Sequence, residues 1–245
     1  EECPICMRLL PLFTRLQTYA FCCGKTICCG CDLQHNIKNE KRELMEQTPG
    51  LRTCAFCRTA APDSDEEILA QVRKRAELQD PQALSSMALS YGCGRYGLPV
   101  DEAKCVELLR QAAGLGLPGA QYQLGAVYHD GEFGLEQNEE EGRKWWEKAA
   151  EGGHLLSLHT LGNVEGKHGD HVAGMRHLRM SASGGYRKSI EVLIGCFEIG
   201  FLYHDDLAET MQSFYRARDE LKSKDRDQYI AYLKSTGEYK GEYDD

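Results

Sequence analysis

The sequence has no apolar run approaching the roughly 20 residues that a transmembrane helix needs, and no secretory signal pattern. It also has no surplus of basic residues: 29 lysines and arginines stand against 38 aspartates and glutamates, for a formal net charge of −9. Basic stripes with interleaved aromatic residues, which are typical of nucleic-acid binding, are absent as well. The sequence therefore predicts neither a membrane nor a nucleic acid as a partner.

Catalytic motifs are also lacking. The sequence contains no recognisable set of nucleophile, base and orienting group, and no glycine-rich phosphate loop. No catalytic residue is therefore predicted, and any enzymatic role has to use chemistry that a partner carries.

Cysteine is scarce after Arg58, because nine of the 12 cysteines precede that residue. The other three (Cys93, Cys105 and Cys196) are scattered, and we interpret them as small apolar or loop residues. Paired cysteines in one part of the chain favour metal ligation in a reducing compartment over disulfides, so a cytoplasmic or nuclear location is expected. Since a cysteine follows Glu1 by only two residues, we expect a trimmed fragment, whose upstream targeting segment the sequence does not reveal.

Four cysteine pairs make up the N-terminal block. Cys3–Cys6 and Cys54–Cys57 are C-x-x-C pairs, Cys28-Cys29-Gly30-Cys31 contains a third, and Cys22–Cys23 are adjacent. Two residues between ligands let a tight turn direct both thiolates at one ion, and zinc favours tetrahedral sulfur coordination in structural sites. The block predicts two structural zinc ions, with the ligands Cys3, Cys6, Cys22, Cys23, Cys28, Cys31, Cys54 and Cys57.

The order of these pairs resembles a RING-type zinc finger of the all-cysteine variant. In that family the first and third pairs share one ion, and the second and fourth pairs share the other. The resemblance implies one site of Cys3, Cys6, Cys28 and Cys31, and another of Cys22, Cys23, Cys54 and Cys57. The family places one to three residues between the ligands that are adjacent here, so the second site either uses the vicinal pair or is incomplete. His35 is a spare candidate that we interpret as solvent-facing, and Cys29 is interpreted as a non-ligand.

The RING resemblance also implies an activity and its contact residues. It implies a ubiquitin ligase that binds a ubiquitin-conjugating enzyme charged with ubiquitin and positions the thioester, without a covalent ligase intermediate. Ile5 and Arg58 stand at family contact positions, Arg58 as a basic linchpin, and Phe56 extends the apolar patch. Alternatively, Ile5 packs under the zinc knuckle, Phe56 belongs to the core and Arg58 is a solvated charge.

Beyond Pro81 the sequence repeats itself with a period of 37 residues. Residues 82–88 align with 119–125, and 108–113 align with 145–150, with Asp101 opposite Asn138 in the loop. A shortened third copy and a degenerate fourth copy, which starts near Ser189, follow. Periods of this size indicate stacked helical hairpins. Residues 65–79 are expected to open the stack, and a helix near 225–233 to close it.

The interior glycines of this pattern predict close helix contacts. Gly125 and Gly162 each cost about 1 kcal/mol of helix propensity, and they recur at the same place in the repeat. We expect a neighbouring helix to approach there. The aromatic residues Tyr122, Tyr128, Trp145 and Trp146 are interpreted as helix-packing residues. Five histidines in the repeats are interpreted as surface residues, namely His154, His159, His168, His171 and His177.

The repeats resemble Sel1-like repeats, which are relatives of the tetratricopeptide repeat, over about residues 80–220. The second copy carries the family pattern at Ala120, Leu124, Gly125, Tyr128, Gly131, Trp145, Trp146, Ala149, Ala150 and Gly153. The resemblance implies an extended surface that holds a protein substrate or a complex subunit.

Together these features predict a small zinc-stabilised α+β RING domain followed by an all-α helical-hairpin repeat solenoid. The expected boundaries are 1–60 for the zinc finger, 61–79 for a linker and capping helix, 80–222 for about four repeats, and 223–245 for a C-terminal helix and a disordered acidic tail. The predicted function is a RING-type ubiquitin ligase whose repeats hold the substrate. The alternative is a non-catalytic zinc-binding scaffold.

Overall fold

The computed structural model describes residues 2–7, 10, 17–46, 53–222 and 224–236. They form two compact units: one is drawn from residues 1–71 and 219–245, and the other from residues 72–218. The tail that the sequence predicts to be disordered, from residue 237 onward, lies outside the described residues. Among the helices within the described ranges, none combines the length and apolar character that a membrane-spanning segment requires.

The first unit contains a short β-hairpin followed directly by a helix. Strands β1 (Gln17–Ala20) and β2 (Lys25–Cys28) pair antiparallel, with Thr18 opposite Ile27. Helix α1 (Cys29–Glu46) begins at the residue after β2. The hydroxyl of Thr18 donates a hydrogen bond to the Asp32 carboxylate at 3.0 Å, which ties the hairpin to the first turn of α1.

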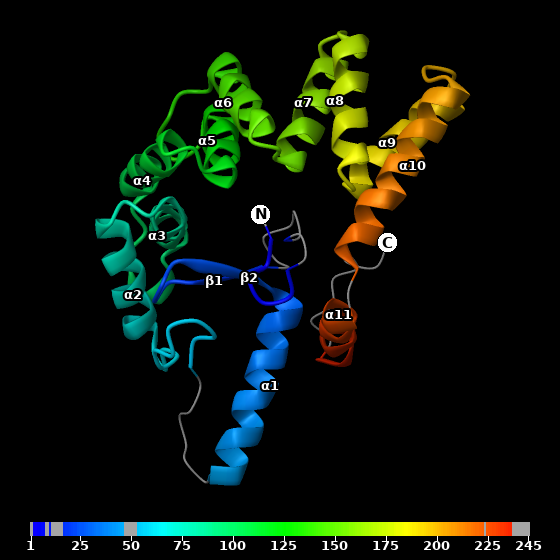
Figure 1. Cartoon of the computed structure of the whole chain (residues 1–245). Helices are drawn as coiled ribbons and strands as arrows, with labels where there is room; N and C mark the ends of the chain where they lie inside the picture. The colour runs from blue at the N-terminus through cyan, green and yellow to red at the C-terminus, as the bar shows by residue number, and fades with distance from the viewer. Residues whose placement is uncertain (1, 8–9, 11–16, 47–52, 223, 237–245) are drawn as a thin grey trace. The chain divides into compact units, whose positions relative to one another are not determined.

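Helix α11 (Lys224–Thr236) packs against α1 within this unit (Figure 1). The side-chain amide of Gln34 donates a hydrogen bond to the side-chain oxygen of Gln228, and Leu233 is buried. The sequence predicted a helix near 225–233 that closes the repeat stack. The helix is present, but the assignment to the stack was wrong, because its contacts are with α1.

The core of the first unit is small and rich in sulfur. Its buried residues are Cys3, Leu10, Ile27, Cys28 and Cys31, with Cys6 and Phe56 packed against them. So few apolar side chains do not hold a unit of this size by themselves, and small domains with small cores generally need a metal or another cross-link.

Helical pairs make up the second unit and succeed one another along the chain (Figure 1). Helix α2 (Asp65–Glu77) leads into them and buries Leu69, Val72 and Ala76 on one face. The helices of the four pairs are α3 (Pro81–Cys93), α4 (Glu102–Gly114), α5 (Pro118–Asp130), α6 (Glu139–Glu151), α7 (Leu155–Lys167), α8 (His171–Ser183), α9 (Arg187–Glu198) and α10 (His204–Leu221).

The second helix of each of the first three pairs begins with the same cap. The side chains of Asp101, Asn138 and Asp170 each accept a hydrogen bond from the backbone N–H three residues later, at 2.9–3.0 Å. Such caps satisfy backbone donors that the helix itself leaves without partners. The structure thus confirms the alignment of Asp101 with Asn138 and extends it to the third pair.

Close approach of paired helices at the interior glycines is also confirmed. A Cβ atom added at Gly125 would lie 2.9 Å from the carbonyl oxygen of Gly142 and 2.5 Å from Trp146 Cδ1. At Gly162 it would lie 2.9 Å from the carbonyl oxygen of Gly174. Trp146 is 3% exposed and donates its indole N–H to the backbone oxygen of Tyr122 at 3.1 Å, as expected of a helix-packing residue.

Three of the repeat histidines are not surface residues. His154, His159 and His177 are partly buried. Their Nδ1 atoms lie 2.9 Å from the Ser157 hydroxyl, 2.9 Å from a second serine hydroxyl, and 2.7 Å from the Glu165 carboxylate. The surface interpretation was wrong for these residues, because neighbouring helices cover them. Within the part of the chain that the structure describes, the five histidines form no metal-binding group.

Candidate metal centre

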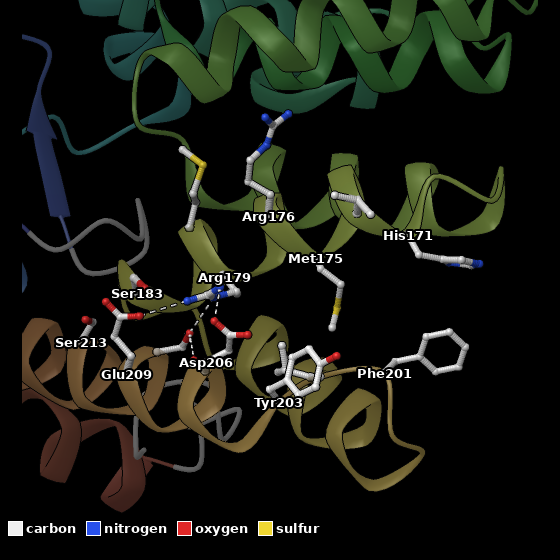
Figure 2. Close-up of a pocket in the computed structure, with 14 residues that line it drawn as sticks. His171, Met175, Arg176, Arg179, Ser183, Phe201, Tyr203, Asp206, Glu209 and Ser213 are labelled. Atoms are coloured by element: carbon white, nitrogen blue, oxygen red, sulfur yellow. Dashed lines mark hydrogen bonds and ion pairs between the residues drawn. The ribbon is translucent and has the colours of Figure 1, made fainter.

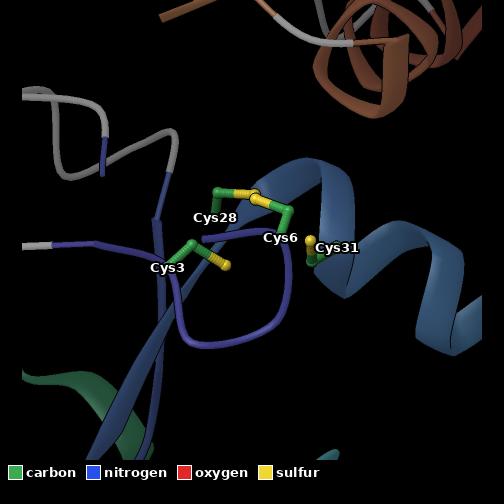
Figure 3. Close-up of side chains that lie close together, drawn as sticks. All are labelled: Cys3, Cys6, Cys28 and Cys31. Carbon is green, nitrogen blue, oxygen red and sulfur yellow. The ribbon is translucent and has the colours of Figure 1, made fainter. Parts of the chain in front are cut away.

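The first cysteine group joins a loop, a strand end and a helix start. Cys3 and Cys6 lie in a tight turn, which the backbone N–H of Met7 closes by donating to the carbonyl oxygen of Cys3 at 2.8 Å. Cys28 is the last residue of β2, and Cys31 lies in the first turn of α1. Figure 3 shows the four side chains turned toward one another. Their sulfur atoms all lie within 4.8 Å of one another.

The second group joins the hairpin tip to a later loop. Cys22 and Cys23 occupy the turn between β1 and β2, where Gly24 adopts a positive φ of 72°. Cys54 and Cys57 lie in a second tight turn, flanked by an isolated β-bridge between residues 53 and 60. The four sulfur atoms again lie within 4.8 Å of one another. The structure therefore brings the vicinal pair together with the fourth pair.

Both C-x-x-C turns end on a residue with left-handed backbone. The N–H of Arg58 donates to the carbonyl oxygen of Cys54 at 3.1 Å, as the N–H of Met7 does to that of Cys3. Met7 has a φ of 55° and Arg58 a φ of 61°. This conformation is uncommon for residues other than glycine, and sequence reasoning missed the equivalence because methionine and arginine give no sign of it.

The spacing of the sulfur atoms matches a tetrahedral zinc site. With a zinc–sulfur distance of about 2.3 Å, the sulfur atoms of a regular tetrahedron are about 3.8 Å apart. The Sγ atoms of Cys6 and Cys28 are 3.8 Å apart, and those of Cys23 and Cys54 are also 3.8 Å apart. The Sγ atoms of Cys22 and Cys57 are closer, at 3.4 Å. Each group of four cysteines could therefore hold a metal ion.

Neither the spare candidate His35 nor Cys29, which was interpreted as a non-ligand, joins a group. The Nε2 atom of His35 lies 2.6 Å from the backbone carbonyl oxygen of Thr53, and its side chain is partly buried. The prediction that His35 faces solvent was wrong, because this contact holds the ring against the second C-x-x-C segment. Cys29 is buried outside both groups.

The acidity of the thiols differs within each group. Hydrogen bonds from the side chain and backbone N–H of Thr59 lower the pKa of the Cys57 thiol to about 6. Burial, together with the neighbouring thiols of Cys57 and Cys54, raises the pKa of Cys22. In the first group, burial raises the pKa of the Cys3 thiol. Backbone hydrogen bonds, above all the one from Cys28, outweigh the burial and lower this pKa to about 7.

Four thiolates within 4.8 Å of one another would repel one another strongly, so a cation is needed to stabilise all four charges. Zinc, when bound, would supply the positive charge that stabilises four thiolates and would cross-link the segments that carry them. An ion with four protein ligands has no open position for substrate or water, so the sites are suited to a structural role.

The predicted contact residues lie in different environments. Ile5 is 48% exposed, in the turn between Cys3 and Cys6, so it does not pack under the knuckle. Arg58 is exposed next to Cys57. Phe56 packs against the small core, and the Nζ atom of Lys25 lies 5.2 Å from its ring centroid. The core interpretation therefore describes Phe56, whereas Ile5 and Arg58 are accessible.

Comparison with known proteins bears on the helical unit. Residues 81–117 and 118–154, which contain α3 to α6, match the family model of the Sel1 repeat. The chain therefore carries Sel1 repeats, as the sequence predicted, and these repeats are generally protein-binding modules. The RING resemblance of residues 1–60 remains a prediction.

One solved structure supports the same fold, and a second is similar over part of the chain. The chain is similar to c5321, a protective antigen of uropathogenic Escherichia coli with an SLR fold, at 26% identity and a TM-score of 0.56. The similarity covers 77% of this chain but only 41% of that protein. A Sel1 repeat protein from Oxalobacter formigenes is 28% identical over 53% of this chain and 98% of its own length, with a TM-score of 0.49. The likeness to c5321 confirms the helical repeat solenoid.

Proposed function

We propose that this protein is a zinc-dependent interaction scaffold, in which the cysteine unit binds one protein and the Sel1 repeats bind another. The observation that carries the proposal is the grouping of eight cysteines into two interleaved sets of four, in a chain that also carries Sel1 repeats. A scaffold needs two stable surfaces and no reactive group. This agrees with structural zinc sites that leave no coordination position open.

Metal analysis of the purified full chain tests the first half of the proposal. Two zinc ions per chain are expected, and Cys57→Ser is expected to lose at least one. Cys93→Ser is the matched control, because Cys93 is exposed and stands outside both groups. Wild-type protein that binds no zinc, or a Cys57→Ser variant that keeps both ions, would contradict the proposal.

A ubiquitin ligase of the RING type is the second candidate function. The exposure of Ile5 and Arg58 supports it, because both residues stand at contact positions of the family and are free to meet a conjugating enzyme. In this role Ile5 would pack on the enzyme, and the guanidinium of Arg58 would hydrogen-bond both enzyme and ubiquitin. The ligase would act by holding the thioester in a reactive geometry.

Discharge of ubiquitin from a panel of charged conjugating enzymes onto free lysine separates the two functions. A ligase accelerates discharge, and Ile5→Ala abolishes the acceleration with zinc content unchanged. Met7→Ala is the matched control, because Met7 is also exposed in this loop. Arg58→Lys is expected to lose most of the effect, since lysine does not offer the forked donors of arginine. If protein that holds two zinc ions does not accelerate discharge, the ligase function is wrong and the scaffold function stands.

A further inference from the structure

The fourth helical pair departs from the second and third pairs at the positions of closest approach. Gly125 and Gly162 are the eighth residues of α5 and α7, and Gly142 and Gly174 are the fourth residues of α6 and α8. In α9 and α10 these positions are Ile194 and Leu207. Leu207 is buried and Ile194 is partly exposed, and the backbones of α9 and α10 approach each other at fewer positions than those of the first three pairs.

A groove of about 770 Å³ lies between α8 and α10, and we call it the α8–α10 groove (Figure 2). One end is apolar, lined by Met175, Phe201 and Tyr203 among others. Phe201 is 62% exposed and Tyr203 is 82% exposed. Val172, which lines the groove from α8 as Met175 does, is 84% exposed. Exposed apolar side chains that gather along one groove are a feature of protein interaction sites.

The other end of the groove is charged, and its charges are paired. Arg179 on α8 contacts Asp206 at 2.8 Å and Glu209 at 3.2 Å, both on α10. Its Nε donates to the hydroxyl of Thr210 at 3.2 Å. These bonds connect the two walls, so the groove has a fixed width at this end. They also occupy both carboxylates.

Arg176 provides a charge that is not paired in this way. It lines the groove from α8, one helical turn after Val172 and one turn before Met180, and it is exposed. Across the described ranges, no hydrogen bond or ion pair of its guanidinium is formed. The groove therefore offers an apolar end and a free cation, whereas its two carboxylates are already engaged by Arg179.

We propose that the α8–α10 groove binds an amphipathic peptide segment of a partner protein. An apolar side chain of the peptide lies among Met175, Phe201 and Tyr203, and a carboxylate of the peptide pairs with Arg176. An acidic peptide is favoured over a basic one, because the unpaired charge of the groove is positive. This inference rests on the proposed function, since it specifies the surface of the repeats that holds a partner.

A displayed library of random 16-residue peptides, selected on the zinc-loaded full chain, tests the groove. Enriched peptides are expected to combine large apolar residues with aspartate or glutamate. Val172→Ser and Tyr203→Ser should each weaken their binding about tenfold or more. Arg176→Glu should weaken acidic peptides similarly and enrich lysine-containing peptides in a second selection. The controls are Leu115→Ser and Arg73→Glu, at exposed positions outside the groove, and they should leave binding unchanged.

The outcomes separate this inference from the scaffold proposal. If the peptides bind the repeats but their affinity is unchanged by the Val172, Arg176 and Tyr203 substitutions, the groove proposal is wrong and the scaffold proposal stands. Enriched peptides that are basic rather than acidic overturn the assigned ligand chemistry. A selection that enriches no binder to the zinc-loaded chain overturns the groove and counts against binding by the repeats altogether.

Discussion

The two units of this protein hold their shapes by different means. In the cysteine unit, three of the buried core residues, Cys3, Cys28 and Cys31, belong to the first four-cysteine group. In the repeat unit, leucines, alanines and glycines recur at equivalent helix positions, and Leu124, Leu161 and Leu193 are fully buried. The two cysteine groups of the first unit could each hold a metal ion that joins distant segments, whereas each pair of the second unit depends on its neighbours.

The two units should therefore be destabilised by different kinds of change. Loss of an ion removes a cross-link between segments that few apolar contacts hold, so it affects the whole cysteine unit. A local change in the repeats acts mainly on one pair and its neighbours. Both tryptophans, Trp145 and Trp146, lie in α6. Tryptophan fluorescence therefore reports the repeat unit alone.

Removal of a buried ligand should have the largest effect. Cys28→Ser is expected to release one zinc ion and unfold the cysteine unit, because structural zinc contributes on the order of 10 kcal/mol to folding. Bound zinc per chain and proteolytic cleavage before residue 60 measure this. Cys29→Ser is the neighbouring control and should keep both ions. If Cys28→Ser lowered the midpoint of tryptophan unfolding as well, the two units would not be independent.

A methyl group between paired helices should have the next largest effect. Gly162→Ala is expected to lower the free energy of unfolding by roughly 3 kcal/mol, because its Cβ would overlap Leu178 and the Gly174 carbonyl. Gly166→Ala in the same helix meets no atom within 4 Å. It should instead raise stability by up to about 1 kcal/mol through helix propensity. Urea unfolding, followed by tryptophan fluorescence and circular dichroism, checks both. Equal effects of the two variants would contradict the close approach.

The repeats should also lose stability in acid through His154. Burial lowers the pKa of His154 to about 4, so between its ordinary value and pH 4 the unfolded chain binds the proton more readily than the folded one. Stability is therefore full above about pH 6.5 and falls as the pH drops, by on the order of 2 kcal/mol. His154→Gln should flatten this dependence, whereas the exposed His168→Gln should not. If the free energy of unfolding of His154→Gln depended on pH as that of the wild type does, His154 would not be the cause of the acid sensitivity.

The smallest expected effect is the loss of a helix cap. Asn138→Ala removes the acceptor for the backbone N–H of Glu141 and should lower the free energy of unfolding by about 1 kcal/mol. Asn138→Asp keeps an acceptor and adds a negative charge at the helix N-terminus, so it should retain full stability. Urea unfolding followed by fluorescence measures both variants. A loss in Asn138→Asp as large as in Asn138→Ala would contradict the capping role.

Repetition explains how much of the fold could be predicted from the sequence. Gly125 and Gly162 indicated a close helix contact because the same costly residue stands at the same place twice. The division of the eight cysteines into two groups came from the order known in a family, since spacing alone gives the pairs but not their partners. The structure groups them as that order implies.

The features that were missed depend on contacts between distant segments. The burial of His154 comes from Tyr122, in the preceding pair, whose ring centroid lies 5.1 Å away. The packing of α11 on α1 joins segments that no repeat relates. The α8–α10 groove also depends on such contacts, because its walls come from α8 and from residues 201–213.

The packing of α11 against α1 has a consequence for protein synthesis. A ribosome delivers α1 before any repeat and α11 only after α10, so the cysteine unit receives its last helix when the whole repeat array has already emerged. Until then, the face of α1 around Gln34 is uncovered. A nascent chain paused before residue 224 would leave that face exposed to solvent, and α11 covers it once it has emerged.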